Sequence, residues 1–134
     1  MSLAIPSQHI LVVDDESPVR DALKMVLTFE GHTVELASDG PEALKKMSEQ
    51  KFDIVFTDLK MPEMLGHELA RSIKSKFPHQ AVIMLTAYEG FLNPPQEKRT
   101  NPVDFIINKP FSITSIVSAV RRAHEINTTN SRKN

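Results

Sequence analysis

The sequence has no cysteine, and its 16 basic and 17 acidic side chains leave a net charge of only −1. The lack of cysteine excludes disulfide bonds, thiolate metal sites and cysteine nucleophiles. Because charges of both signs are interspersed, the chain has no basic field for nucleic acid and no polybasic face for a membrane. It also lacks an apolar run long enough to cross a bilayer, and residues 1–7 do not have the pattern of a secretory signal. We therefore expect a cytoplasmic protein with no direct nucleic-acid binding and no membrane attachment.

The length of 134 residues suits one domain with a sizeable core. We expect an N-terminal extension over residues 1–7, a single domain over 8–127 and a polar, frayed C-terminal tail over 128–134. Neither internal repeats nor low-complexity segments suggest another organisation.

Five short apolar runs, separated by polar turns, have the pattern of strands buried on both faces. Their ranges are Ile10–Val13, His32–Ala37, Phe52–Thr57, Ala81–Leu85 and Val103–Ile107. Helical patterns alternate with these runs, so the connections are expected to be right-handed crossovers. The sequence therefore predicts an α/β fold: a flavodoxin-like, doubly wound, five-stranded parallel sheet with strand order 2-1-3-4-5.

Start and stop signals place most of the helices. Ser17 is the expected N-cap of the first helix, Pro18 its first residue and Gly31 its end, and Val19, Ala22, Leu23, Met25, Val26 and Leu27 have core spacing. Further helices are expected from Pro41, over His67–Phe77 with Phe77 on the apolar side, and after Ser112 with Ile113 inward. The segment 88–102 contains Gly90 and three prolines, so the fourth helix is expected to be irregular or shortened.

Five polar side chains stand at the ends of the predicted strands. Asp14 and Asp15 follow the first strand, Asp58 the third and Thr86 the fourth, and Lys109 comes after the fifth. Because the carboxyl ends of parallel strands meet at one edge of a sheet, we expect these side chains to converge. Three carboxylates at one place are costly unless a proton or a cation intervenes. An open set of oxygen ligands suits Mg²⁺, or Mn²⁺ in its place.

This set, together with Met61, Pro62 and Gly66 after Asp58 and with Pro110 and Phe111 after Lys109, resembles the receiver domain of two-component response regulators over about residues 8–126. The resemblance implies a phosphoacceptor in a phosphorelay, which takes a phosphoryl group from a histidine kinase or phosphotransfer protein onto Asp58. The switched surface would then act on a downstream protein or on an output domain absent from this chain, and a homodimer is possible.

The resemblance also assigns roles to single residues. Asp15 and Asp58 would bind the metal directly, Asp14 through water, and the backbone carbonyl of Lys60 would complete the protein ligands. The Thr86 hydroxyl and the Lys109 ammonium would contact the phosphoryl oxygens.

Three further positions support the site or its switching. The small Ala87 leaves room for the phosphoryl group, and the Lys109–Pro110 bond is expected to be cis. Ile106 holds the position where many receivers have an aromatic residue, so the usual coupling of threonine to that aromatic is altered here.

Two other functions compete with this one. A Mg²⁺-dependent phosphohydrolase of the haloacid-dehalogenase type also uses a strand-end aspartate. The motif of that family is Asp-x-Asp, however, and here Glu16 stands two residues after Asp14. A receiver-like interaction module that works without phosphorylation would keep the same fold. The sequence does not separate a full-length protein from a receiver excised from a longer regulator, and it does not name the kinase or the output partner.

Overall fold

The five strands of the computed structural model form one parallel sheet in the order β2-β1-β3-β4-β5, as the sequence predicts. The structure describes residues 5–59, 65–87 and 103–133. The strands are β1 (His9–Val13), β2 (Thr33–Ala37), β3 (Ile54–Asp58), β4 (Ala81–Thr86) and β5 (Phe105–Asn108). Each bound lies within two residues of its predicted position, and the fold is flavodoxin-like.

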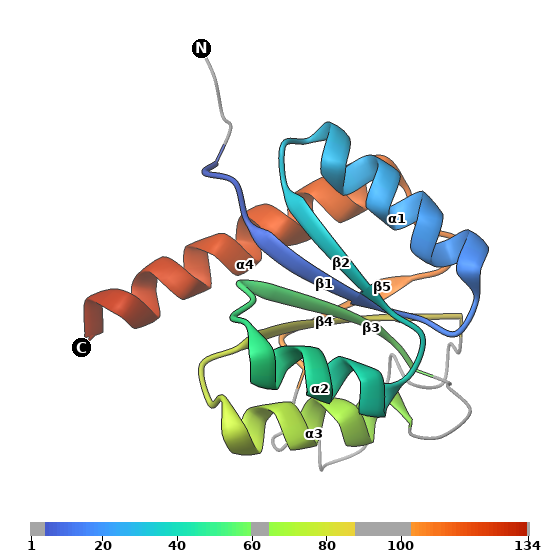
Figure 1. Cartoon of the computed structure of the whole chain (residues 1–134). Helices are drawn as coiled ribbons and strands as arrows, with labels where there is room; N and C mark the ends of the chain where they lie inside the picture. Colours follow the sequence, from blue (N-terminus) through green and yellow to red (C-terminus); the bar gives the residue numbers. More distant parts are fainter. Residues whose placement is uncertain (1–4, 60–64, 88–102, 134) are drawn as a thin grey trace.

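Helices cover both faces of this sheet (Figure 1). In the described part of the chain they are α1 (Ser17–Phe29), α2 (Gly40–Glu49), α3 (Gly66–Lys76) and α4 (Ile113–Lys133). Helices α1 and α4 lie on one face, and α2 and α3 on the other (Figure 1). No helix among the described residues is long and apolar enough to cross a membrane.

The core consists of two layers that follow the alternation of side chains along the strands. In β1, Ile10 and Val12 pack toward α1 and α4, whereas Leu11 and Val13 pack toward α2 and α3. All four side chains are fully buried. Since burial on both faces fixes the strand register, the carboxyl ends of β1, β3 and β4 come to lie at one edge of the sheet.

The first helix begins differently from its prediction. Ser17 is the first helical residue and Glu16 is the N-cap, without a side-chain capping bond, while Gly31 ends the helix with φ of 97° as expected. The backbone N–H of Glu16 donates to Asp14 Oδ1 at 2.9 Å, and this turn fixes where the helix starts. Met25, predicted at core spacing, is 72% exposed. It lies to the side of the narrow stripe centred on the buried Leu23 and Leu27.

The predicted frayed tail from Thr128 is wrong, because α4 continues to Lys133. The Asn127 side-chain amide donates to the Asp53 carbonyl at 3.0 Å, and the Thr128 hydroxyl donates to the His124 carbonyl at 2.7 Å. Polar side chains thus form hydrogen bonds where the apolar pattern stops. Phe77 and Ile113, expected inward, are also exposed because they stand at helix ends.

The expected irregular fourth helix in 88–102 lies outside the described residues, as do Lys60, Met61 and Pro62. The domain boundaries at residues 8 and 127 stay predictions.

His32 makes the stability of the fold depend on pH. Its ring is buried, its Nδ1 accepts the backbone N–H of Gln8 at 3.0 Å, and burial lowers its pKa below 6.5 although the charge of Glu30 opposes this. The folded state therefore binds fewer protons than the unfolded state in that range. The stability that the neutral, buried His32 contributes is fully present above the pKa of this residue in the unfolded state. It is lost as the pH falls through the lower pKa of His32 in the folded state.

We expect the free energy of unfolding to fall more in the wild type than in His32→Asn between about pH 8 and about pH 5, because the neutral, buried ring must take up a proton. Chemical denaturation at each pH measures the difference. His79→Asn, at an exposed histidine, is the control and should keep the wild-type slope. Equal slopes for the wild type and His32→Asn would contradict this account.

Candidate functional site

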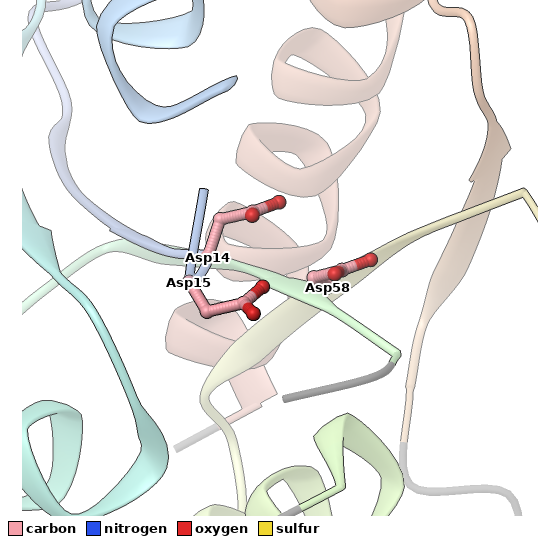
Figure 2. A group of neighbouring side chains, drawn as sticks. All are labelled: Asp14, Asp15 and Asp58. Atoms are coloured by element: carbon pink, nitrogen blue, oxygen red, sulfur yellow. The ribbon is translucent and has the colours of Figure 1, made fainter. Parts of the chain in front are cut away.

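Asp14, Asp15 and Asp58 converge at the carboxyl edge of the sheet, as predicted (Figure 2). Each offers a carboxylate oxygen, and these oxygens all lie within 4.8 Å of one another. The reason is local: β1 and β3 are direct neighbours in the sheet, and the three aspartates follow or end these strands. Strand pairing therefore brings the three acids to the same place.

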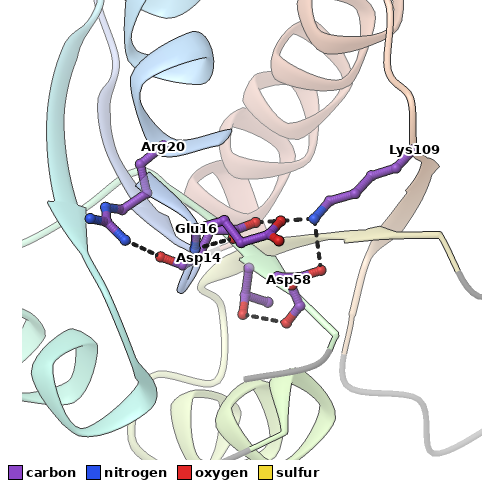
Figure 3. A network of polar contacts seen from close by, with 6 residues as sticks. Asp14, Glu16, Arg20, Asp58 and Lys109 are labelled. Atoms are coloured by element: carbon purple, nitrogen blue, oxygen red, sulfur yellow. Dashed lines mark hydrogen bonds and ion pairs between the residues drawn. The ribbon is translucent and has the colours of Figure 1, made fainter. Parts of the chain in front are cut away.

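Lys109 supplies a positive charge to this cluster. Its Nζ lies 3.2 Å from Asp14 Oδ2 and 3.1 Å from Asp58 Oδ1 (Figure 3). The residue follows β5, and its backbone N–H donates to the Thr86 carbonyl at 2.8 Å. The Lys109–Pro110 peptide bond is cis, as expected. The ammonium thus lies between the acids at the ends of two strands.

Burial and the neighbouring charges together shift the pKa values of both Asp58 and Lys109 upward. Burial raises the pKa of Asp58, the charge of Asp14 adds to the rise, and Lys109 opposes it. Burial would lower the pKa of Lys109, but its contacts with Asp58 and Asp14 outweigh it and leave that pKa raised. The site therefore keeps a charged lysine and concentrates more negative charge than one ammonium can neutralise.

The donor set fits a hard divalent cation. Both oxygens of Asp14 already have partners, since Oδ1 accepts from the Glu16 N–H and Oδ2 from Lys109. Asp15 is exposed, and Asp58, 8% exposed, opens on the same pocket. Oxygen ligands with open positions suit Mg²⁺. Asp15 and Asp58 are thus better placed than Asp14 for direct coordination.

Thr86 and Ala87 line the pocket together with Asp15, Asp58 and Lys109. Thr86 ends β4 and is buried, whereas Ala87 is exposed at the mouth. The structure thus brings together all the predicted side chains that point to chemistry. The Lys60 carbonyl lies outside the described residues.

Ile106 and Pro110 do not belong to this pocket. Ile106 is half-buried opposite Met84 in β4, and Pro110 is exposed. The neighbouring aromatic, Phe105, packs against the α1 and α4 side of the core, with the Arg122 guanidinium carbon 4.3 Å from its ring centre. The aromatic side chain of β5 therefore occupies the sheet face opposite to that of Ile106.

Two further residues, which the sequence did not single out, form hydrogen bonds to the backbone of the site. Arg20 Nη1 donates to the Asp14 carbonyl at 2.6 Å, and the Thr57 hydroxyl donates to the Asp58 carbonyl at 3.0 Å. The Glu16 N–H donates to Asp14 Oδ1 and so closes the acidic turn, which consists of residues 14–16. Nothing in the spacing of an arginine six residues after an aspartate identifies such a contact.

Comparisons with known proteins agree with this site. Residues 10–121 match the family model of the response regulator receiver domain. The response regulator MprA of Mycobacterium ulcerans is 34% identical over 115 residues, which cover 86% of this chain and 49% of that protein. The response regulator FleR of Pseudomonas aeruginosa is 30% identical over 84% of this chain and 24% of its own length. The chain thus spans about half or less of these relatives.

Solved structures give the same result. A response regulator receiver domain protein from Clostridium thermocellum has a TM-score of 0.80 at 33% identity, over 91% of this chain and 96% of that one. The response regulator TrrA of Thermotoga maritima, in complex with Mg²⁺–BeF, has a TM-score of 0.79 at 34% identity, over 87% and 98% of the two chains. Fold, acidic cluster and relatives agree, and the chain belongs to the response regulator receiver domain family, a family of signalling domains.

Proposed function

We propose that this chain accepts a phosphoryl group on Asp58 in a Mg²⁺-dependent phosphorelay and that the modification switches a protein-interaction surface. The observation that carries the proposal is the convergence of three carboxylates and Lys109 at the carboxyl edge of the sheet. The donor would be a histidine kinase or a phosphotransfer protein. The similar structure of TrrA, which is in complex with Mg²⁺–BeF, supports Mg²⁺ as the cation. Mn²⁺ binds the same kind of oxygen ligands.

In the proposed reaction an Asp58 carboxylate oxygen attacks the phosphorus of phosphohistidine. The oxygen–phosphorus bond forms as the nitrogen–phosphorus bond breaks, and the leaving imidazole nitrogen keeps the electron pair and takes up a proton from water. The product is an acyl phosphate. Later attack of water on that phosphorus would release inorganic phosphate and restore the carboxylate.

The residues of the pocket have separate tasks in this step. Asp15 and Asp58 would hold the cation directly, Asp14 through water, and the Lys60 carbonyl would complete the protein ligands. When bound, Mg²⁺ neutralises charge on the phosphoryl oxygens. Lys109 would neutralise charge that develops on the same oxygens, because its ammonium already lies 3.1 Å from Asp58.

Phosphorylation would add charge and strong acceptor oxygens at the end of β3. The Thr86 hydroxyl, one strand away in the ladder, would donate to one of these oxygens, and Ala87 would leave room for it. Movement at Thr86 would pass along β4 to Met84 and its partner Ile106 in β5. Since Ile106 is not aromatic, the output face would differ from that of receivers with an aromatic residue there.

The wider setting is part of the same proposal. We place the protein in the cytoplasm, where its downstream partner is another protein or an output domain. Neither nucleic acid nor a membrane is expected to bind this chain directly, and a homodimer is a possible output state.

Intact mass after incubation with acetyl phosphate tests the proposal. The wild type should gain one phosphoryl group with Mg²⁺ and none after chelation, and Asp58→Asn should gain none under either condition. Asp21→Asn, the same change at an exposed carboxylate of α1, is the control and should behave as the wild type. Continuous turnover of the donor without a stable adduct would instead favour a phosphohydrolase. No modification of a folded, Mg²⁺-binding protein by this donor or by a phosphorylated histidine kinase would favour a phosphorylation-independent module.

A further inference from the structure

Arg20 contacts neither the expected metal position nor Asp58, yet it holds the backbone between the two neighbouring acids. Its Nη1 donates to the main-chain carbonyl of Asp14 at 2.6 Å (Figure 3). That carbonyl belongs to the peptide unit that joins Asp14 to Asp15. The orientation of this unit sets the direction in which the Asp15 side chain leaves the backbone.

Asp14 and Asp15 differ in how their carboxylates are fixed. The Asp14 N–H donates to the Ala37 carbonyl, and both carboxylate oxygens accept hydrogen bonds, from Glu16 and Lys109. In contrast, the exposed Asp15 carboxylate makes no hydrogen bond or ion pair with any residue in the described ranges. The position of the Asp15 carboxylate therefore depends on its backbone, which Arg20 holds.

The Arg20 side chain is itself confined. It is half-buried in the first turns of α1, and its charge is close enough to Glu42 to help lower the pKa of that carboxyl, after the larger effect of the hydrogen bond from the Ser38 backbone. The Glu42 carboxylate is anchored by Ser38 at 2.8 Å and 3.0 Å. Arg20 is thus hydrogen-bonded to the backbone of Asp14, and its charge lies on the side of the start of α2.

We infer that Arg20 is a positioning residue for the divalent cation, because it presets the Asp14–Asp15 peptide unit so that the Asp15 carboxylate faces Asp58. This inference rests on the proposed function. The positioning role and a purely electrostatic role of Arg20 predict opposite changes in Mg²⁺ affinity when the residue is removed. A nearby positive charge repels Mg²⁺, so removal of charge alone would tighten Mg²⁺ binding, whereas loss of the hydrogen bond to the Asp14 carbonyl weakens it.

Calorimetric titration of Mg²⁺ into the full chain tests this sign. Arg20→Ala is expected to weaken Mg²⁺ binding by about tenfold or more, in the range seen when residues that orient metal ligands are removed. Arg20→Lys keeps the charge and a donor and should recover most of the affinity. Lys24→Ala, at an exposed position of the same helix, removes the same charge without this contact and should bind Mg²⁺ as tightly as the wild type or slightly more tightly.

The dependence of phosphorylation on Mg²⁺ gives a second readout. In Arg20→Ala the half-saturating Mg²⁺ concentration should rise, while the maximal rate at saturating Mg²⁺ stays near that of the wild type. Arg20→Gln, too short to reach the Asp14 carbonyl, should behave in the same way and replaces Arg20→Ala if that variant does not fold.

Unchanged or tighter Mg²⁺ binding in these variants would overturn the inference and leave the proposed function intact. A lower maximal rate with unchanged Mg²⁺ dependence would also overturn it. A wild type that binds no Mg²⁺ would overturn the proposed function and the inference together.

Discussion

Lys109→Met is expected to slow phosphorylation of Asp58 by acetyl phosphate by about 10²- to 10³-fold, the usual effect of removing one preorganised charge-stabilising donor. Methionine keeps an unbranched side chain of similar length but has no charge. The Lys109 ammonium lies 3.2 Å from Asp14 and 3.1 Å from Asp58, so its loss removes a positive charge in direct contact with the attacking carboxylate. The rate of mass gain at saturating Mg²⁺ measures the effect.

Loss of Lys109 should also increase the dependence of stability on Mg²⁺. Asp14 and Asp58 are buried, and Lys109 is the residue that forms ion pairs with both of them in the described part of the chain, so its loss leaves their repulsion less compensated. We expect the increase in melting temperature on addition of Mg²⁺ to be larger in Lys109→Met than in the wild type.

Lys74→Met is a matched control for this prediction. Lys74 pairs with Asp104 at 3.0 Å, with a side chain that is also partly buried, but this pair lies at the opposite edge of the sheet, where Asp104 accepts from the Val82 N–H. The variant should lose some stability and keep the wild-type rate of phosphorylation. A Lys109→Met protein that is modified as fast as the wild type would show that Lys109 does not stabilise the transition state.

Gly66→Ala is expected to destabilise the protein by about 2 kcal/mol or more, as overpacking of a tight contact does. A Cβ at this position would lie 2.0 Å from the Asp58 carbonyl oxygen and 2.9 Å from its carbonyl carbon. The Gly66 N–H also donates to the Leu59 carbonyl at 2.7 Å, so α3 cannot move away without loss of that bond. The backbone of Asp58 would have to shift, and phosphorylation should slow.

Helix propensity alone would predict the opposite change in stability for Gly66→Ala. Alanine is better than glycine inside a helix by about 1 kcal/mol, so without the clash the substitution at the start of α3 would be neutral or stabilising. Gly31→Ala is the control: its φ is 97°, but nothing lies within 4 Å of the added Cβ. It should cost about 1–2 kcal/mol through backbone strain and leave the phosphorylation rate unchanged. A stable, normally phosphorylated Gly66→Ala would contradict the close approach of α3 to Asp58.

The features that the sequence could predict depend on short-range pattern and on the geometry of parallel sheets. The buried strands are continuous apolar runs, and parallel pairing places Asp14, Asp15, Asp58, Thr86 and Lys109 at one edge whatever the details of the helices. The convergence of these five side chains could therefore be predicted from their positions in the chain.

The features that the sequence did not predict depend on single side-chain contacts. The start of α1 follows a hydrogen bond from Glu16 to the Asp14 carboxylate, and Arg20 reaches back to the Asp14 carbonyl. In α4, the Asn127 side chain donates to a carbonyl 74 residues away in the sequence. Periodicity and propensity carry no information on such contacts, because polar side chains at these positions equally suit solvent.

The most direct test of the central claim is to locate the phosphoryl group. Wild-type protein phosphorylated with acetyl phosphate and Mg²⁺ is reduced with borohydride, which converts an acyl phosphate to an alcohol, and the digested peptides are sequenced by tandem mass spectrometry. The account predicts homoserine at position 58 and unmodified aspartate at positions 14 and 15. Reduction at another acid, or a phosphoryl group that survives borohydride on a histidine, serine or threonine, would contradict it.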